Sequence, residues 1–244
     1  MLAVTSAQAG LIVDTVSTDL TAFGFGTAPS VLTLQRDTLE AGCVVPINSV
    51  GGFSTSCAGG PAGYTDLSGS LVSGNNKYAT PTLTALGVTS FSNLAILFNV
   101  NEPGTSQQVT LQNLTLTLYD GTTSLFTFSL DDLGVSGPTD LTDIAQGQGG
   151  SGFLIRIATG ELPPAGLFSG DLRVGLAAIV GCASADGCDV AGQFGTAAGA
   201  ESFTIANVEG GGGPGQEVPE PATAALLGGG LMVLAWAWRR RRAY

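Results

Sequence analysis

The sequence predicts an all-β fold, an antiparallel β-sandwich of jelly-roll type, for most of the chain. Short apolar segments with alternating polarity recur between turn residues, and 37 of the 244 residues are glycine. Only 11% of the residues are charged while 44% are hydrophobic, a composition typical of a secreted β-rich protein. We expect four parts: a signal-peptide remnant at 1–9, the β-sandwich at 10–208, a linker at 209–217 and a tail at 218–244.

Residues 1–9 resemble the end of a secretory signal peptide. Ala7-Gln8-Ala9 has the A-x-A form of a cleavage site ahead of Gly10. The cationic region and most of the apolar region of such a peptide are absent from residues 1–9, so we expect the natural start to lie upstream. The alternative is an N-terminal strand of small residues.

Nine strands are expected between Gly10 and Val208. Their mark is a period of two, as in Phe153, Ile155 and Ile157, which alternate with less apolar neighbours. Short helical turns are the expectation for Asp131–Gly134 and Thr139–Ala145. The expected strands are Leu11–Ser17, Val31–Gln35, Thr65–Ser73, Asn93–Asn101, Gln108–Tyr119, Ser124–Leu130, Gly152–Ala158, Asp171–Val180 and Glu201–Val208.

A hairpin over Gln108–Leu130 is the most specific structural prediction. Val109 and Leu111 share one phase of the alternation, whereas Leu114, Leu116 and Leu118 share the other. This change at Gln112–Asn113 predicts a β-bulge or a crossing between sheets. Asp120-Gly121 then provides a strong turn signal into the second strand.

The last part of the chain reads as a linker and a membrane anchor. Residues 209–217 are Gly-rich and predict a flexible linker. Residues 222–238 are apolar and, as a helix, are about 26 Å long, the short end of what spans a bilayer core of about 30 Å. Arg239, Arg240, Arg241 and Arg242 follow, and the positive-inside rule places this cytoplasmic stop inside the cell and the body outside the cytoplasm.

A proline-bounded lead, Val218-Pro219-Glu220-Pro221, precedes the apolar run. This lead, one helix and a terminal arginine cluster together resemble the PEP-CTERM sorting signal; the resemblance is confined to residues 218–244. It implies that the tail is a transient inner-membrane anchor and that exosortase, a membrane-embedded cysteine transpeptidase, recognises the lead. It also implies a Gram-negative bacterium that makes exopolysaccharide, and a place at the cell surface or in a biofilm matrix. A permanently anchored single-pass protein is the alternative.

Charge and composition restrict the chemistry of the body. The chain ahead of the tail arginines has 19 acidic residues and only four cationic ones, which are Arg36, Lys77, Arg156 and Arg173. This acidic field argues against nucleic acid and anionic polymers as direct ligands. The chain has no histidine, which excludes His-based triads, zinc ligation by His and His acid–base catalysis.

The four cysteines predict two disulfides, because an even number in an exported protein is typical of a disulfide framework. Three connectivities are possible. We favour the two local pairs, because each closes a Gly-rich loop. The spacings do not match the close pairs of a four-thiolate zinc site. The local pairs are Cys43–Cys57 and Cys182–Cys188.

Other candidate sites are weak. Asp140 and Asp143, followed by Gly-Gln-Gly, form a calcium candidate, although Asp residues also cap turns. Nineteen acids make some carboxylate pair unavoidable, so a glycosidase pair is not informative. We therefore expect a non-enzymatic protein without a cofactor, with a carbohydrate-binding module for exopolysaccharide as the alternative. Sugar sites are usually lined by aromatic residues, and this body has no Trp and only three Tyr: Tyr64, Tyr78 and Tyr119.

Overall fold

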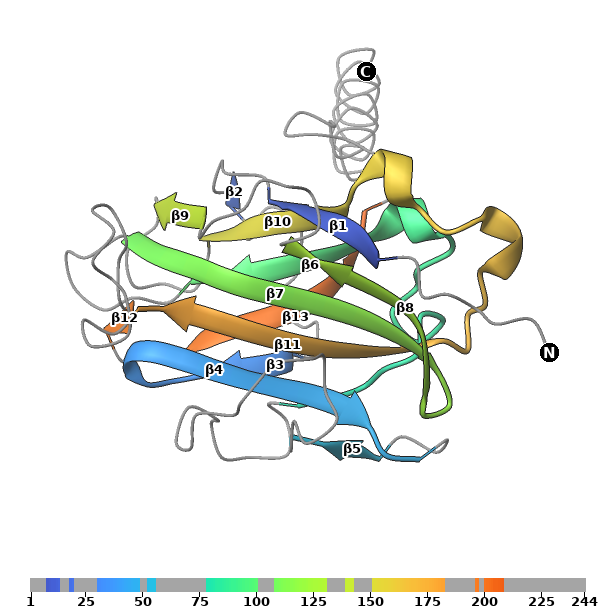
Figure 1. Ribbon diagram of the computed structural model, residues 1–244, viewed down its shortest axis with the longest axis horizontal. Helices are drawn as coiled ribbons and strands as arrows, with labels where there is room; N and C mark the ends of the chain where they lie inside the picture. Colours follow the sequence, from blue (N-terminus) through green and yellow to red (C-terminus); the bar gives the residue numbers. More distant parts are fainter. Residues whose placement is uncertain are drawn as a thin grey trace, which may run out of the picture. The chain divides into compact units, whose positions relative to one another are not determined.

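The chain divides into two compact units, residues 1–211 and 212–244. A computed structural model describes residues 8–13, 18–19, 30–48, 52–55, 78–100, 108–130, 139–142, 151–182, 196–197 and 200–208, all of which belong to the first unit. In these ranges the secondary structure consists of β-strands and short 3-10 helices (Figure 1). None of the helices in these ranges is long and apolar enough to cross a membrane. The predicted helix at 222–238 lies outside them.

The strands form one curled, open sheet. Its main order is β12-β4-β11-β7-β8-β1-β10-β6-β13-β3; in addition β2 pairs with β10, β5 with β4 and β9 with β7. The strands are β1 (Gln8–Val13), β2 (Thr18–Asp19), β3 (Ser30–Leu34), β4 (Asp37–Pro46), β5 (Phe53–Ser54), β6 (Leu94–Asn99), β7 (Gln108–Asp120), β8 (Thr123–Ser129), β9 (Thr139–Thr142), β10 (Ser151–Ile157), β11 (Arg173–Gly181), β12 (Thr196–Ala197) and β13 (Glu201–Asn207). The 3-10 helices are η3 (Phe91–Asn93), η5 (Thr159–Glu161) and η6 (Ala165–Leu167).

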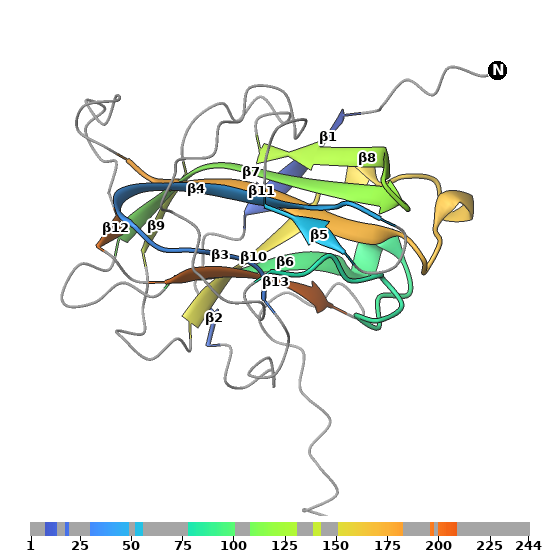
Figure 2. The same ribbon diagram turned by 90° about the horizontal axis from the view of Figure 1, so that it is seen from below.

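The curl of the sheet produces two facing layers. Figure 2 shows β4, β11, β7 and β8 in one layer, with β3, β13, β6 and β10 in the other. β1 joins them: its residues 8–10 pair in parallel with β8, and its residues 11–13 pair antiparallel with β10. The all-β prediction is thus confirmed. The jelly-roll connectivity also depends on residues outside the described ranges and stays a prediction.

The two layers enclose one apolar core. Phe98 of β6 and Phe203 of β13 are fully buried and stack with their ring centroids 4.5 Å apart and 10° between the ring planes. The opposite layer contributes alternate residues of β7 and β11, among them Leu116 and Val174. This is the inward-facing alternation on which the strand predictions rest.

The predicted hairpin is confirmed, bulge included. β7 and β8 pair antiparallel, with Asp120 opposite Thr123. Gly121 has a φ of 59°, and Thr122 has no positive φ, which is the pattern of a type II′ turn. On the other side of β7, Ile179 pairs with Asn113 and Val180 with Leu111, so Gln112 is the extra residue of a bulge.

Some predictions differ from the structure. β4 was not predicted. The expected helical turn at Thr139–Ala145 is wrong at its start, because Thr139–Thr142 forms β9 against β7. β1 begins at Gln8, inside the predicted signal-peptide remnant. The predicted strand Thr65–Ser73 and the predicted turn Asp131–Gly134 lie outside the described residues.

Candidate functional site

The sites predicted in the tail lie outside the described residues. They comprise the linker at 209–217, the helix at 222–238 and two groups of side chains. The first group is the sorting lead, Val218, Pro219, Glu220 and Pro221. The second is the cytoplasmic stop, Arg239, Arg240, Arg241 and Arg242. The structure does position candidate residues of the β-body, which is the β-sandwich predicted at residues 10–208.

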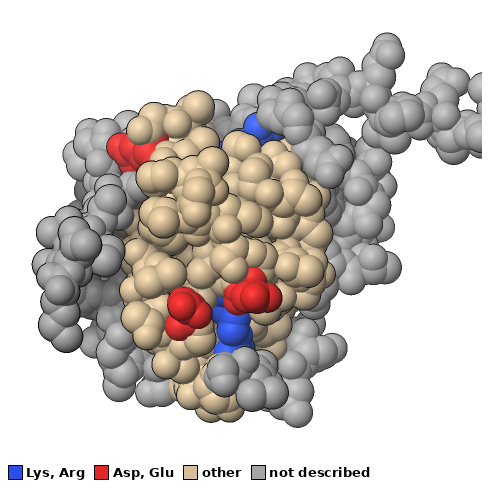
Figure 3. All heavy atoms as spheres, turned by 90° about the vertical axis from the view of Figure 1, so that its right-hand side faces the viewer, with Lys and Arg blue, Asp and Glu red and all other residues tan. Residues whose placement is uncertain are grey.

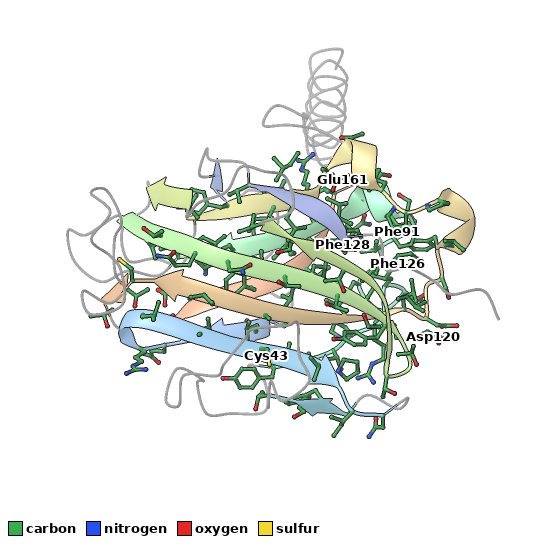
Figure 4. The ribbon with its side chains drawn as sticks, in the orientation of Figure 1. Cys43, Phe91, Asp120, Phe126, Phe128 and Glu161 are labelled. Carbon is green, nitrogen blue, oxygen red and sulfur yellow. The ribbon has the colours of Figure 1, made fainter. Side chains whose placement is uncertain are left out.

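Two of the four cysteines lie in the described part of the body, and both are disulfide-bonded. Cys43 is fully buried in β4 (Figure 4), and Cys182 directly follows β11. Cys43 lies opposite Ala177, whereas Gly181 lies opposite Leu39, so Cys182 is five positions along the ladder from the partner of Cys43. Five strand residues span about 16 Å, far beyond the Cα separation of about 7 Å that a disulfide tolerates.

Cys43 and Cys182 are therefore not bonded to each other, and the same separation excludes one zinc site with all four thiolates. Their predicted partners, Cys57 and Cys188, lie outside the described residues. The Cys43 sulfur lies 3.9 Å from the carbonyl oxygen of Thr55, two residues before Cys57. This proximity supports the local pairs, which remain a prediction.

The calcium candidate is only partly described. Asp140 lies in β9 opposite Thr110 of β7, a ladder position rather than a loop, and Asp143 lies outside the described residues. Within the described ranges, no group of three or more His, Cys, Asp or Glu is arranged to hold a metal ion. The calcium candidate itself stays a prediction.

Two buried carboxylates were not singled out from the sequence. Glu40 of β4 and Glu201 of β13 are both fully buried. One oxygen of Glu40 accepts the backbone N–H of Arg36 at 2.6 Å, which fastens the short connection between β3 and β4. This is a structural task, and a single Glu within a mixed strand carries no sequence signal that would reveal it.

Arg173 is the most deeply placed cation of the described body, with 3% of its surface exposed at the start of β11. Its guanidinium donates to the carbonyl oxygen of Thr80 at 3.0 Å and to that of Gly52 at 2.9 Å. It also donates to the carbonyl oxygen of Asn48 and to the Thr80 hydroxyl. Burial lowers the pKa of Arg173. Because these acceptors are all neutral protein groups, the arrangement joins three segments rather than presenting the cation to a ligand.

The tyrosines of the described body do not form a sugar platform. Tyr78 and Tyr119 are both buried, and the Tyr78 hydroxyl donates to the carbonyl oxygen of Thr33 at 3.1 Å. Burial raises the pKa of Tyr119, and a hydrogen bond with Thr117 partly offsets the rise. Tyr64 lies outside the described residues.

Aromatic rings gather instead at one end of the body. Phe91 contacts Phe126 and Phe168 edge-on, at centroid distances of 5.5 and 5.2 Å. Figure 4 shows Phe91, Phe126 and Phe128 close together at this end, and Figure 3 shows the same end as a largely uncharged surface. Phe91 and Phe128 are buried, and Phe126 and Phe168 are partly buried, so these four rings cap the core.

The described fold defines a class, an all-β protein built on one curled sheet. Comparison with protein families makes the assignment more specific. Residues 217–242 match the family model described as the PEP-CTERM protein-sorting motif. No curated protein and no solved structure matches the chain.

The predicted recognition of the tail is therefore confirmed: this chain carries a PEP-CTERM sorting motif. The motif marks an exported protein that is processed at the membrane, and it implies recognition by exosortase. The match is confined to the tail, so the activity of the β-body has to be argued from its own residues.

Proposed function

We propose that this protein serves without catalysis at the cell surface or in the extracellular matrix, after exosortase has sorted it through its tail. The host would be an exopolysaccharide-producing Gram-negative bacterium. The observation that carries this proposal is the sorting motif at residues 217–242. The β-body is the cargo, and it stays at the cell surface or joins the biofilm matrix.

The tail explains how the cargo is handled. Residues 222–238 hold the chain in the inner membrane as a helix, with Arg239–Arg242 in the cytoplasm. Pro219 and Pro221 keep the lead outside that helix, so that exosortase reaches its backbone. The Gly-rich linker at 209–217, with a root-mean-square reach of roughly 15–18 Å, separates the lead from the body.

The body suits a structural role. The chain has no histidine, and the two described cysteines are oxidised, so neither imidazole catalysis nor a thiolate at Cys43 or Cys182 is available. The buried Arg173 bonds to protein groups, and the buried aromatic rings pack in the core. The predominance of acids over cations favours solubility and repels anionic polymers.

The test follows the full chain in a host with an active exosortase and in the same host without it. We expect mass spectrometry of the exported protein to show a new C-terminus near Pro219–Pro221 only where exosortase is active. Glu220→Gln should block this change. Glu209→Gln, which removes a carboxylate at the start of the linker and outside the matched motif, is the matched control and should be processed normally.

Retention of residues 222–244 in the surface protein of both hosts would contradict sorting and indicate the permanent anchor. A carbohydrate-binding role is tested separately, by sedimentation of the processed protein with the host's own exopolysaccharide. Saturable binding would replace the purely structural role by this alternative. The buried Tyr78 and Tyr119 lead us to expect none.

A further inference from the structure

Gly10 and Glu161 meet at the point where β1 passes from one layer to the other. The backbone nitrogen of Gly10 donates a hydrogen bond to the Glu161 carboxylate, across 151 residues of sequence. Figure 4 shows Glu161 in η5, just beyond the end of β10. Gly10 itself is buried, and Glu161 is partly buried.

The turn at residues 158–161 places this carboxylate beside Gly10. After β10 ends at Ile157, η5 turns the chain back, and the N–H of Glu161 donates to the carbonyl oxygen of Ala158 at 2.9 Å. The N–H of Ala158 in turn donates to the carbonyl oxygen of Gly10 at 3.0 Å. Both backbone groups of Gly10 are therefore held by the segment 158–161.

Gly10 also marks a boundary within β1. The residues after it, Leu11 to Val13, form the antiparallel ladder with β10, and Leu11 lies in the core. Gln8 and Ala9, which precede it, pair in parallel with Thr127 and Phe128 at the edge of β8. Loss of Gln8 and Ala9 would leave the antiparallel ladder intact.

The sequence places an A-x-A cleavage pattern, Ala7-Gln8-Ala9, directly before this nitrogen. We propose that Glu161 is the built-in counter-ion for a mature N-terminus at Gly10. The inference rests on the proposed export, because only an exported chain meets a signal peptidase. Hydrolysis of the Ala9–Gly10 bond takes up one water, leaves a carboxylate on Ala9 and converts the Gly10 amide nitrogen into an ammonium group.

The nitrogen that donates as an amide is the same atom that becomes the ammonium, so the partner is already in place. A carboxylate bonded to a neutral amide is satisfied without any charge opposite it. The bond to the carboxylate is already charge-assisted; an ammonium at the same position adds a unit positive charge opposite it, so both partners are ionised and a direct Coulomb attraction is gained. A carboxylate also serves a peptide N–H, as Glu40 does for Arg36, but only an ammonium at this nitrogen balances the charge of Glu161.

The first experiment determines the N-terminus of the protein recovered from the exported fraction of its host, by mass spectrometry after selective labelling of α-amines. A start at Gly10 is expected. An exported protein with any other start would overturn this inference and leave the proposed function standing. A protein found only in the cytoplasm with residues 1–9 attached would overturn both.

The second experiment measures the ion pair itself. Full chains beginning at Gly10 are prepared in detergent with and without Glu161→Gln, and the rate of reductive methylation of the α-amine is followed at neutral pH. We expect the amine to react roughly three- to tenfold faster in Glu161→Gln, because the carboxylate holds it protonated. Asp171→Asn removes an exposed carboxylate elsewhere in the body and is the matched control.

A merely structural role for Glu161 would give a different result. In that case Glu161→Gln would destabilise the chain beginning at Met1 as much as the chain beginning at Gly10. The ion pair instead requires a larger loss of stability in the Gly10 form, because only this form carries the ammonium at that position. Equal losses together with equal amine reactivity would overturn the inference.

Discussion

Replacing Arg173 with methionine tests how the long connections of the body are held. Methionine fills the volume of the stem but donates no hydrogen bonds. The change removes the donors that serve Thr80, Gly52 and Asn48, which precede Arg173 by 93, 121 and 125 residues. The strand β11 would then lose its polar ties to two distant segments.

The magnitude follows from two opposing effects. Thr80 is buried, so its carbonyl and hydroxyl oxygens lose their partner without gaining water, at about 1–3 kcal/mol each. The backbone carbonyls of Asn48 and Gly52 belong to less buried residues and can turn to solvent. Against this, burial lowers the pKa of Arg173, so removing the charge recovers some desolvation energy. The expected net loss is about 2–4 kcal/mol of unfolding free energy.

The measurement is urea unfolding of the full chain in mild detergent, followed by circular dichroism. Arg36→Met is the matched control, because the Arg36 side chain is exposed and the bonds of Arg36 with Glu40 and Thr196 are made by its backbone. The control should stay within about 0.5 kcal/mol of the parent. A loss below about 1 kcal/mol in Arg173→Met, or a gain, would refute the reasoning that these acceptors depend on the guanidinium.

Three further predictions concern local features. Gly181→Ala should cost about 2 kcal/mol or more in urea unfolding, because Gly181 has a φ of 77° and a Cβ there would lie 2.2 Å from the Thr38 carbonyl oxygen. Gly166→Ala, which has open space around its Cβ, should cost little, and equal losses would contradict this. Peptide mapping without reduction should recover the two local disulfide pairs, and any other pairing would show that prediction to be wrong. The Tyr119 phenol should ionise above its usual pKa of about 10, as ultraviolet absorbance will show; since the folded state favours the neutral phenol, stability should fall as pH rises past that value, and less so in Tyr119→Phe.

The elements that the sequence predicts well are those whose pattern is local. The β7–β8 hairpin is specified by its alternation, by the phase change at Gln112 and by the turn at Gly121, all within one stretch. The tail is equally local, since its lead, apolar run and arginines follow each other directly. In both cases neighbouring residues carry the whole signal.

The elements that sequence reasoning missed depend on distant partners. β4 includes Glu40, Ala41 and Gly42, which have weak strand preference, and it forms because β11 provides a full ladder. The β9 strand at Thr139–Thr142 exists because β7 extends past the end of its partner β8. Likewise nothing near Arg173 in the sequence indicates that it bonds to two segments more than 90 residues upstream.

The pairing of early strands with late ones has a consequence for the order in which the protein forms. β1 pairs with β8 and β10, and β3 pairs with β13. The earliest strands therefore cannot pair until strands that are synthesised much later are available. The last of these partners, β13, ends at Asn207, just ahead of the linker and the sorting motif. During export from the N-terminus, the sheet would therefore remain incompletely paired until almost the whole body has crossed the membrane. Folding and the arrival of the sorting motif would then nearly coincide.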